Sequence, residues 1–233
     1  AESVIEWTEY SATAVKLTDS IPVTKEQLND VEFVKSELDR LMNINMALLE
    51  DQQLYAGTGT APQMKGINVY AVDKQAVAVA SPYAGTIDSA NVYDLIAVLR
   101  VIMTTSKQSK VMPNVVLMNP VDILKFKLLK ATDGHYVLPP FIAANGQIVD
   151  GITVVESNQV TANTLTIGDF RYGTIYEAQG LQIEIGLIDK QFVQDAMTIK
   201  ASKRELLLVR NADLEAFAKL TSISAAITAL ETA

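Results

Sequence analysis

Apolar residues recur at spacings of mostly three or four from residue 24 to about residue 55, and this pattern predicts the most prominent element of the chain. Such spacing places the apolar side chains on one face of an α-helix. Thr24 and Gln27 fit a capping box at its start, and Gly57 marks its end. A helix of roughly 30 residues is about 45 Å long, well above the usual length, so it needs an extended surface to lie on. The residues of the stripe are Leu28, Val31, Val34, Leu38, Leu41, Met42, Leu48 and Leu49.

The rest of the chain mixes strands and helices. Amphipathic spacing predicts further helices at about 90–106, 121–130 and 212–230. Pro22 is expected to end the first strand, because proline cannot donate to a strand ladder. The order of elements lacks regular alternation of strand and helix, which indicates an α+β fold. Strands are predicted at 6–24, 66–80, 115–118, 152–156, 165–170, 171–176, 181–187 and 192–208.

Composition narrows the possible functions. The chain has 233 residues, a net charge of −8, no cysteine and one histidine. The length allows one large or two small domains, and the 49% hydrophobic content excludes general disorder. The lack of cysteine excludes disulfides and thiolate chemistry, and the acidic balance argues against tight nucleic-acid binding. No apolar run approaches the roughly 20 residues of a membrane span, and residues 1–7 do not resemble a signal peptide.

Two motifs are candidates for ligand or substrate chemistry. Gly57-Thr58-Gly59 lacks the third glycine and the Gly-Lys-Ser/Thr of phosphate loops, and it follows a helix, so we interpret it as a turn. His135 is the one candidate imidazole base, with Asp133 and Asp122 near it in sequence. The sequence offers no serine in a nucleophile-elbow context to pair with His135, so a small hydrolase that uses His135 stays only an alternative.

The remaining polar and aromatic candidates have structural explanations. Glu50 and Asp51 fall on the polar side of the long helix, and Asp169 follows Gly168 at a strand end, where a turn role is sufficient. Trp7 and Tyr10 suit packing or an interface. We therefore predict no catalytic, cofactor-binding or metal-binding residues, and no enzyme.

An ordered series of motifs resembles the major capsid protein family of tailed bacteriophages. Its first part is Trp7-Thr8-Glu9, then the run from Ile21 to Asp30 that opens the long helix, then a helix exit at 54–59 followed by Gly66-Ile67. The later part comprises the segments 116–120, 150–155 with Thr153 where proline is usual, 168–172 and 204–217. The family shares its fold with encapsulin shells and the herpesvirus capsid floor.

The resemblance implies two domains and an assembly role. A peripheral domain of residues 1–75 and 180–205 would carry a spine helix, at about 24–55, on an elongated antiparallel sheet. An axial domain of mixed α/β structure would take 76–179 and 206–233. The implied function is self-assembly into pentamers and hexamers of an icosahedral head that encloses DNA without sequence-specific binding; an encapsulin-type nanocompartment shell is the alternative.

The same resemblance implies particular partners and a location. Scaffold, maturation protease and portal proteins would be partners, and no cofactor or membrane is implied. The protein would be assembled in the cytoplasm of a bacterial host and would end in the virion.

Two departures from the family pattern carry expectations of their own. The chain begins almost at the Trp7 strand, so we expect a core without the family's N-terminal arm and extended loop. In relatives that crosslink, a loop lysine joins an asparagine with help from a glutamate. Asp195 takes the asparagine position, Ser202 lies near the glutamate position, and no loop lysine is matched. We therefore predict no autocatalytic crosslinking.

Overall fold

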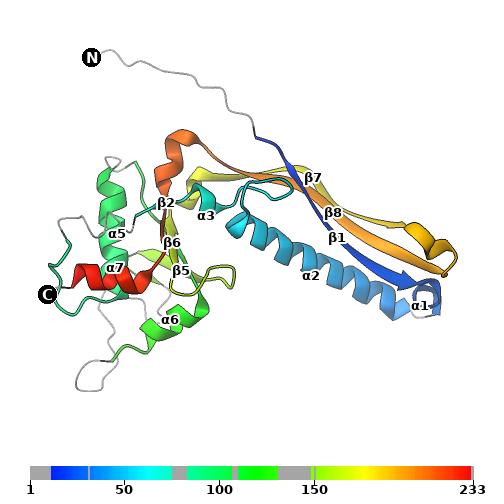
Figure 1. Cartoon of the computed structure of the whole chain (residues 1–233), viewed down its shortest axis with the longest axis horizontal. Helices are drawn as coiled ribbons and strands as arrows, with labels where there is room; N and C mark the ends of the chain where they lie inside the picture. The colour runs from blue at the N-terminus through cyan, green and yellow to red at the C-terminus, as the bar shows by residue number, and fades with distance from the viewer. Residues whose placement is uncertain are drawn as a thin grey trace, which may run out of the picture.

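The protein is elongated, with a narrow arm at one end and a wider body at the other (Figure 1). The computed structural model describes residues 12–30, 32–74, 83–106, 110–130, 148–149 and 151–231. Helices and strands are intermixed, and each part has its own sheet, so the predicted α+β class is confirmed. We call the arm the part that consists of β1 (Val15–Thr24), α1 (Lys25–Asp30), α2 (Glu32–Ala56), β7 (Gly173–Gly186), η2 (Asp189–Phe192) and β8 (Ala196–Val209), and we call the remaining elements the body.

The arm is built on a three-stranded antiparallel sheet in the order β1-β8-β7. Its strands are β1 (Val15–Thr24), β7 (Gly173–Gly186) and β8 (Ala196–Val209). Pro22 lies inside β1, opposite Thr198, so the prediction that it ends the strand is wrong. An edge strand leaves one side of its ladder unpaired, and a residue without an N–H is tolerated there. The predicted strands 171–176 and 181–187 merge into β7, whose register shifts between Glu177 and Gln182 interrupt the sequence pattern.

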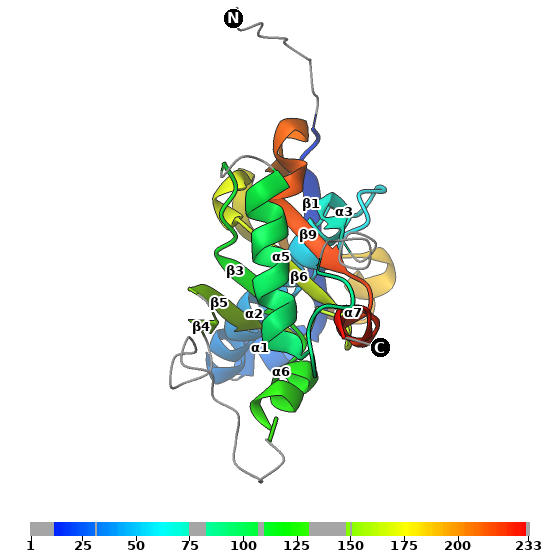
Figure 2. The same cartoon turned by 90° about the vertical axis from the view of Figure 1, so that its left-hand side faces the viewer.

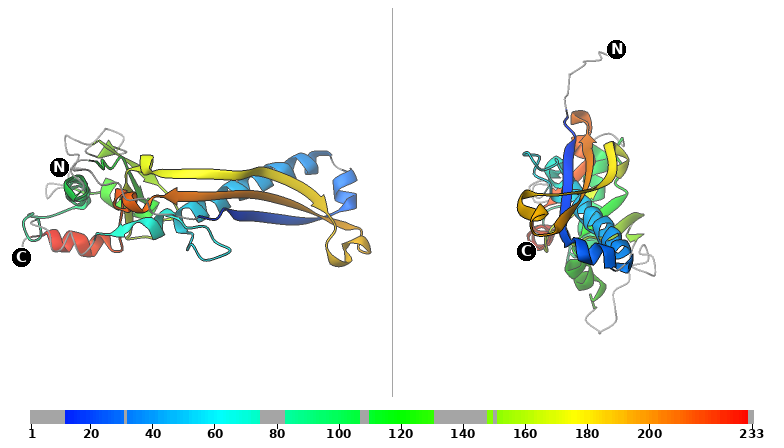
Figure 3. Two further views of the ribbon diagram at one scale, coloured as in Figure 1. Left: turned by 90° about the horizontal axis from the view of Figure 1, so that it is seen from above. Right: turned by 90° about the vertical axis from the view of Figure 1, so that its right-hand side faces the viewer.

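The predicted single helix at 24–55 is two helices, α1 (Lys25–Asp30) and α2 (Glu32–Ala56). Thr24 caps α1 as predicted, because its Oγ1 accepts a hydrogen bond from the Gln27 N–H at 3.4 Å. The Lys25 N–H donates to the Asp195 carbonyl, which ties α1 across the end of the arm, whereas α2 runs along the strands (Figure 3). The apolar spacing could not show this change of direction, since it continues through both segments.

Helix α2 packs on the sheet through a narrow stripe. Met42 and Met46 are buried against β1 and β8, where they meet Leu17, Ile199 and Ala201 in a small core separate from that of the body. Leu38 and Leu49 are partly buried in this core, as expected. Leu41 and Leu48, which the spacing places on the same stripe, are exposed, and the stripe omitted the buried Met46. Among the described residues, the sheet side chains of this core come from β1 and β8. The side chains of 28–35 lie outside the described part.

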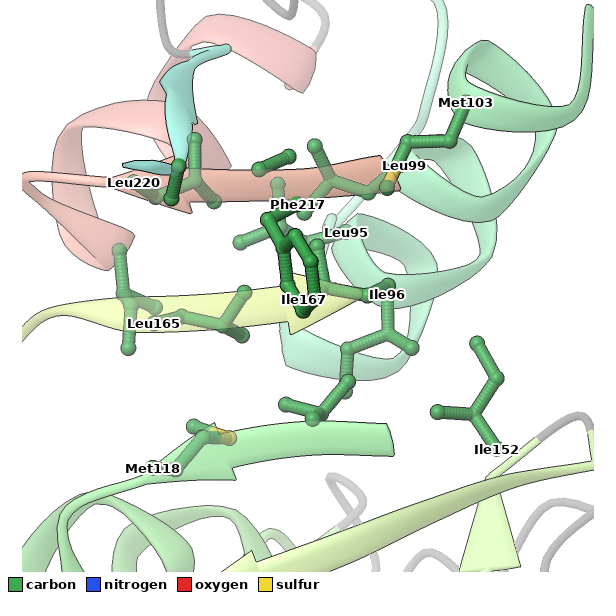
Figure 4. Packing of buried hydrophobic residues seen from close by; sticks show 14 of the residues in the cluster. Leu95, Ile96, Leu99, Met103, Met118, Ile152, Leu165, Ile167, Phe217 and Leu220 are labelled. Atoms are coloured by element: carbon green, nitrogen blue, oxygen red, sulfur yellow. The ribbon is translucent and has the colours of Figure 1, made fainter. Parts of the chain in front are cut away.

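The body contains a six-stranded mixed sheet in the order β2-β9-β6-β3-β5-β4. Helix α5 (Val92–Ser106) lies across one face of this sheet (Figure 2). Tyr55, near the end of α2, contacts the sheet through a 3.0 Å hydrogen bond between its hydroxyl and that of Thr166. Leu95, Ile96, Leu99 and Met103 of α5 pack into its core, as predicted for this helix (Figure 4). The strands are β2 (Val72–Asp73), β3 (Val115–Met118), β4 (Ile148–Val149), β5 (Ile152–Glu156), β6 (Leu165–Gly168) and β9 (Phe217–Leu220).

Shorter elements complete the body and correct two predictions. The segment 66–80 begins as a helical turn, α3, before β2, and 75–82 lie outside the described residues. The predicted helix at 212–230 is a 3₁₀ turn, a strand and a helix, because β9 pairs with both β2 and β6 and buries Phe217 completely. The elements are α3 (Ile67–Tyr70), α6 (Pro120–Lys127), α7 (Ile223–Leu230), η1 (Phe170–Tyr172) and η3 (Asn211–Ala216) in the body, and η2 (Asp189–Phe192) in the arm.

Candidate functional site

The Gly57-Thr58-Gly59 segment is a closed turn, as predicted. The Gly59 N–H donates to the Met64 carbonyl at 3.0 Å, and the Gly66 N–H donates to the Gly57 carbonyl at 2.9 Å. Thr58 uses its hydroxyl on the Gln63 side chain at 2.8 Å. Because these donors are already engaged within the protein, the turn does not present the free N–H groups that cradle a phosphate.

Asp169 is a buried structural carboxylate. It is fully buried and accepts two hydrogen bonds from the Arg171 guanidinium, at 2.8 and 2.6 Å. The N–H groups of Arg171 and Met112 donate to it as well. Burial raises the pKa of Asp169, but the bonds to Arg171 and Met112 outweigh burial and lower that pKa overall. The carboxylate therefore fixes the turn after β6, and all four of its bonds are within the protein.

Four of the other sequence candidates cannot be placed. His135, Asp133, Trp7 and Tyr10 lie outside the described residues. Within the described ranges, no group of three or more acidic or histidine side chains is placed to hold a metal ion. The helices of this part of the chain are each too short or too polar to cross a bilayer.

The notable feature of the surface is instead a row of apolar side chains on the arm. Between residues 175 and 193, nine large apolar side chains are exposed, out of twenty in the part of the chain that the structure describes. Such a concentration marks an interaction surface, whereas isolated exposed apolar residues are ordinary. We call this set the arm surface: Ile175, Tyr176, Leu181, Ile183, Ile185, Leu187, Ile188, Phe192 and Val193.

Register explains why β7 is left uncovered. Ile183 pairs with Ala201, and Ile185 pairs with Ile199, so each isoleucine shares a sheet face with its partner. Ala201 and Ile199 are buried beneath α2, but Ile183 and Ile185 are 39% and 56% exposed. The apolar face of the sheet thus extends past the helix that covers it. The arm ends at η2, where Phe192 and Val193 are 73% and 86% exposed.

Two helices carry smaller exposed apolar rows. On α2, Leu41, Ile44 and Leu48 follow helical spacing on the side away from β7, where Leu48 and Asn45 line a hollow with Thr18 of β1. On the body, Val121 and Leu124 of α6 are exposed together with Leu128 just after it. These rows add to the evidence that the molecule is shaped to contact other protein surfaces.

The sequence analysis missed the arm surface as a functional feature. It recognised 181–187 as a strand but did not ask what would cover its apolar residues. The available signal was the alternation of Leu181, Ile183, Ile185 and Leu187 in a segment with only one amphipathic helix nearby to cover it.

The two residues matched to the crosslinking positions lie apart along the arm, Asp195 just before β8 and Ser202 within it. Asp195 is exposed at a φ of +51° and binds the Lys25 ammonium through Oδ1 at 2.8 Å. Ser202 is buried within β8. The structure therefore ties Asp195 to α1 of the same chain and does not bring Ser202 to it.

Both the sequence and the fold match known proteins. The sequence model described as "Phage capsid family" matches residues 1–221. The chain is 25% identical over 205 residues to the major capsid protein of Enterobacteria phage HK97, covering 87% of this chain and 51% of that protein. The chain thus spans about half the length of this curated relative.

Solved structures share the fold. The capsid of an empty GTA particle superposes with a TM-score of 0.67 at 19% identity, over 94% of this chain and 80% of the other. A chain from Gordonia phage Cozz gives a TM-score of 0.66 at 11% identity, over 94% and 77%. At these identities the likeness shows the fold alone.

Proposed function

The chain belongs to the phage capsid family, and on that basis we propose that it is the major shell subunit of a tailed phage or prophage. Membership of this family makes it a structural virion component. The family match over residues 1–221 carries the proposal, because it extends through both the arm and the body. The encapsulin-type nanocompartment is not favoured, since the family match and the relatives found are phage and GTA capsids.

In the proposed role the subunit works by contact between copies. Residues 1–75 and 180–205 form the peripheral domain, and 76–179 and 206–233 form the axial domain around which pentamers and hexamers gather. Such rings arise from heterologous contacts, in which one surface of a copy meets a different surface of the next. The arm surface and the exposed rows of α2 and α6 suit such contacts. This role requires no catalytic residue.

The proposal extends to the remaining partners and the location. Scaffold, maturation protease and portal proteins act on the shell during assembly in the bacterial cytoplasm. The finished shell encloses DNA without sequence-specific binding. A net charge of −8 suits this, because confinement does not require the phosphate neutralisation on which tight DNA binding depends.

Electron microscopy and light scattering of the purified 233-residue chain test self-association. We expect rings of five or six copies, sheets or closed shells, at a concentration-dependent yield. A species that stays strictly monomeric at all concentrations, while circular dichroism shows it folded, would contradict the proposal for this chain. The alternative hydrolase predicts turnover of ester or amide substrates that is lost on His135→Ala, and we expect no such turnover.

A further inference from the structure

A buried cluster of charges joins α2 to the arm sheet. Glu205 of β8 is completely buried, and its Oε1 atom has no hydrogen-bond partner among the described residues. The Lys203 ammonium lies 2.9 Å from Glu205 Oε2 and 2.9 Å from Oε2 of Glu50, which belongs to α2. One positive charge therefore stands between two negative ones in a site that is largely removed from water.

The groups around Glu205 do not supply the missing charge. On β1 its cross-strand neighbour is the apolar Val15, and on β7 it is Glu177, a further carboxylate. Two residues further along β8, the Leu207 carbonyl accepts a hydrogen bond from the Tyr70 hydroxyl of α3 at 3.2 Å. Among the residues that the structure describes, the charged groups placed towards Glu205 are thus Lys203, Glu50 and Glu177, and their sum with Glu205 is negative.

The electrostatics favour uptake of a proton. Burial raises the pKa of Glu205, the charge of Glu50 raises it further, and Lys203 offsets these effects only in part. Burial opposes the charge of Lys203, but its contacts with Glu205 and Glu50 outweigh burial, so the pKa of Lys203 is raised and the ammonium stays charged. A proton on Glu205 would leave the positive charge of Lys203 and the negative charge of Glu50, a balanced pair that a buried site accommodates far better.

We propose that the Glu50–Lys203–Glu205 cluster binds one proton and that this proton tightens the docking of α2 on the arm sheet. Unprotonated, the cluster holds an unbalanced buried charge that is relieved when α2 separates and water enters. When the cluster is protonated, its charges balance, and docking no longer carries this electrostatic cost. The proposal rests on the cluster alone and does not depend on the proposed shell function.

The direction of the effect follows from linkage. A carboxyl group whose pKa is higher in the docked state stabilises docking fully below its free value, about 4.3. That stabilisation is lost as the pH rises through the pKa that the carboxyl group has in the docked state. Docking of α2 should therefore strengthen from pH 8 towards pH 5, by at most tenfold per pH unit, the limit for one proton.

The chain has no cysteine, so single thiols can report local opening. Met46→Cys places one under α2 in the arm core, and Met118→Cys places one in the body core; both methionines are buried. Labelling by a pyridyl disulfide that reacts in acid is measured from pH 5 to 8. Each rate is divided by that of the denatured chain at the same pH, which removes the titration of the thiol itself. Protection at position 46 should increase as pH falls, and protection at position 118 should change less.

Neutral substitutions then test the cluster. In the Met46→Cys background, Glu205→Gln should raise protection at pH 8 and flatten its pH dependence. Glu50→Gln should flatten it as well, which covers the case in which a buried amide at 205 prevents folding. The matched control is Glu184→Gln in the same sheet, where the carboxylate is exposed and paired with Lys200. It should keep the original pH dependence. A slope unchanged by both cluster substitutions, or protection that falls with acid, would overturn the proposal.

Discussion

Asp169 shows how one side chain can fix a turn that the sequence marks only weakly. Its buried carboxylate receives four hydrogen bonds, two of them from a guanidinium that reaches in from the surface, since the Arg171 side chain is 66% exposed. Position after Gly168 predicted a turn residue, and that role is confirmed. The sequence could not show the burial or the bond from Met112, because these depend on a segment 57 positions away.

Asp169→Asn should lower the free energy of unfolding by about 2–3 kcal/mol, the usual value of hydrogen bonds to a buried charged group. The amide keeps one acceptor but turns a donor towards Arg171 or Met112. Urea unfolding followed by circular dichroism at pH 7 measures the loss. Asp39→Asn on the exposed face of α2 is the matched control and should change the unfolding free energy by less than about 0.5 kcal/mol.

The same substitution has a predicted pH signature. The pKa of Asp169 is lower in the folded protein, so its contribution is complete above the unfolded value of about 3.9 and is lost as pH falls through the folded value. Between pH 5 and pH 2 the native chain should therefore lose more stability than the Asn variant. Parallel acid-unfolding curves for the two proteins would contradict this assignment.

At the scale of elements, periodicity identified helices and strands well wherever one face meets a single core. Helix α5 and strands β3 and β5 lie where the pattern predicts them. The errors fall where long-range contacts determine the secondary structure. Phe217 sits in a helix-like pattern but belongs to a strand because β6 and β2 flank β9, and the position of α1 across the end of the arm involves a contact of Lys25 with the distant Asp195.

The turn that leaves α2 depends on Gly57 for reasons of space. A Cβ at this position would lie 2.2 Å from the Met64 carbonyl oxygen and 2.5 Å from that of Gln53. Gly57→Ala should therefore force the backbone apart and lower the free energy of unfolding by about 2–3 kcal/mol. Chemical denaturation gives this value directly.

Gly186→Ala at the end of β7 provides the matched comparison. Apart from its chain neighbours, no described residue has an atom within 4 Å of where a Cβ would lie, so the same substitution should leave stability nearly unchanged. Equal losses in the two variants would mean that the turn adapts to the methyl group and that close packing at Gly57 is unimportant.

At the scale of the whole molecule, the sequence predicted an elongated subunit but not the surface it presents. An amphipathic pattern shows that a face is apolar, and it does not show whether the same chain covers it. Ile183 and Leu41 both belong to regular patterns and are both exposed, because the arm has one long helix for a three-stranded sheet. Exposure of this kind becomes visible only with the topology in hand.

The arm surface should be required for association between copies. Ile183→Lys puts a charge into its apolar row and should abolish, or reduce at least tenfold, the fraction of chain in rings or shells, since burying an unpaired charge is costly. Sedimentation velocity measures that fraction. Gln182→Lys adds the same side chain on the opposite face of β7, and a larger fraction of this variant than of Ile183→Lys should assemble. Normal assembly of the Ile183→Lys variant would exclude this surface from the contact.

Assembled particles should come apart without covalent links. Asp195 is a carboxylate held by Lys25 of its own chain, and a carboxylate is a poor electrophile for an amine. Ser202, at the position near the family's glutamate, is buried and has no carboxylate with which to accept a proton at neutral pH. Particles boiled in SDS should therefore run as a single band at the mass of one chain. Asp195→Asn restores the amide found in crosslinking relatives but leaves Ser202 without basic character, so this variant should also run as one band. A ladder of multiples in the unaltered protein would show that another lysine and acceptor meet across the subunit contact.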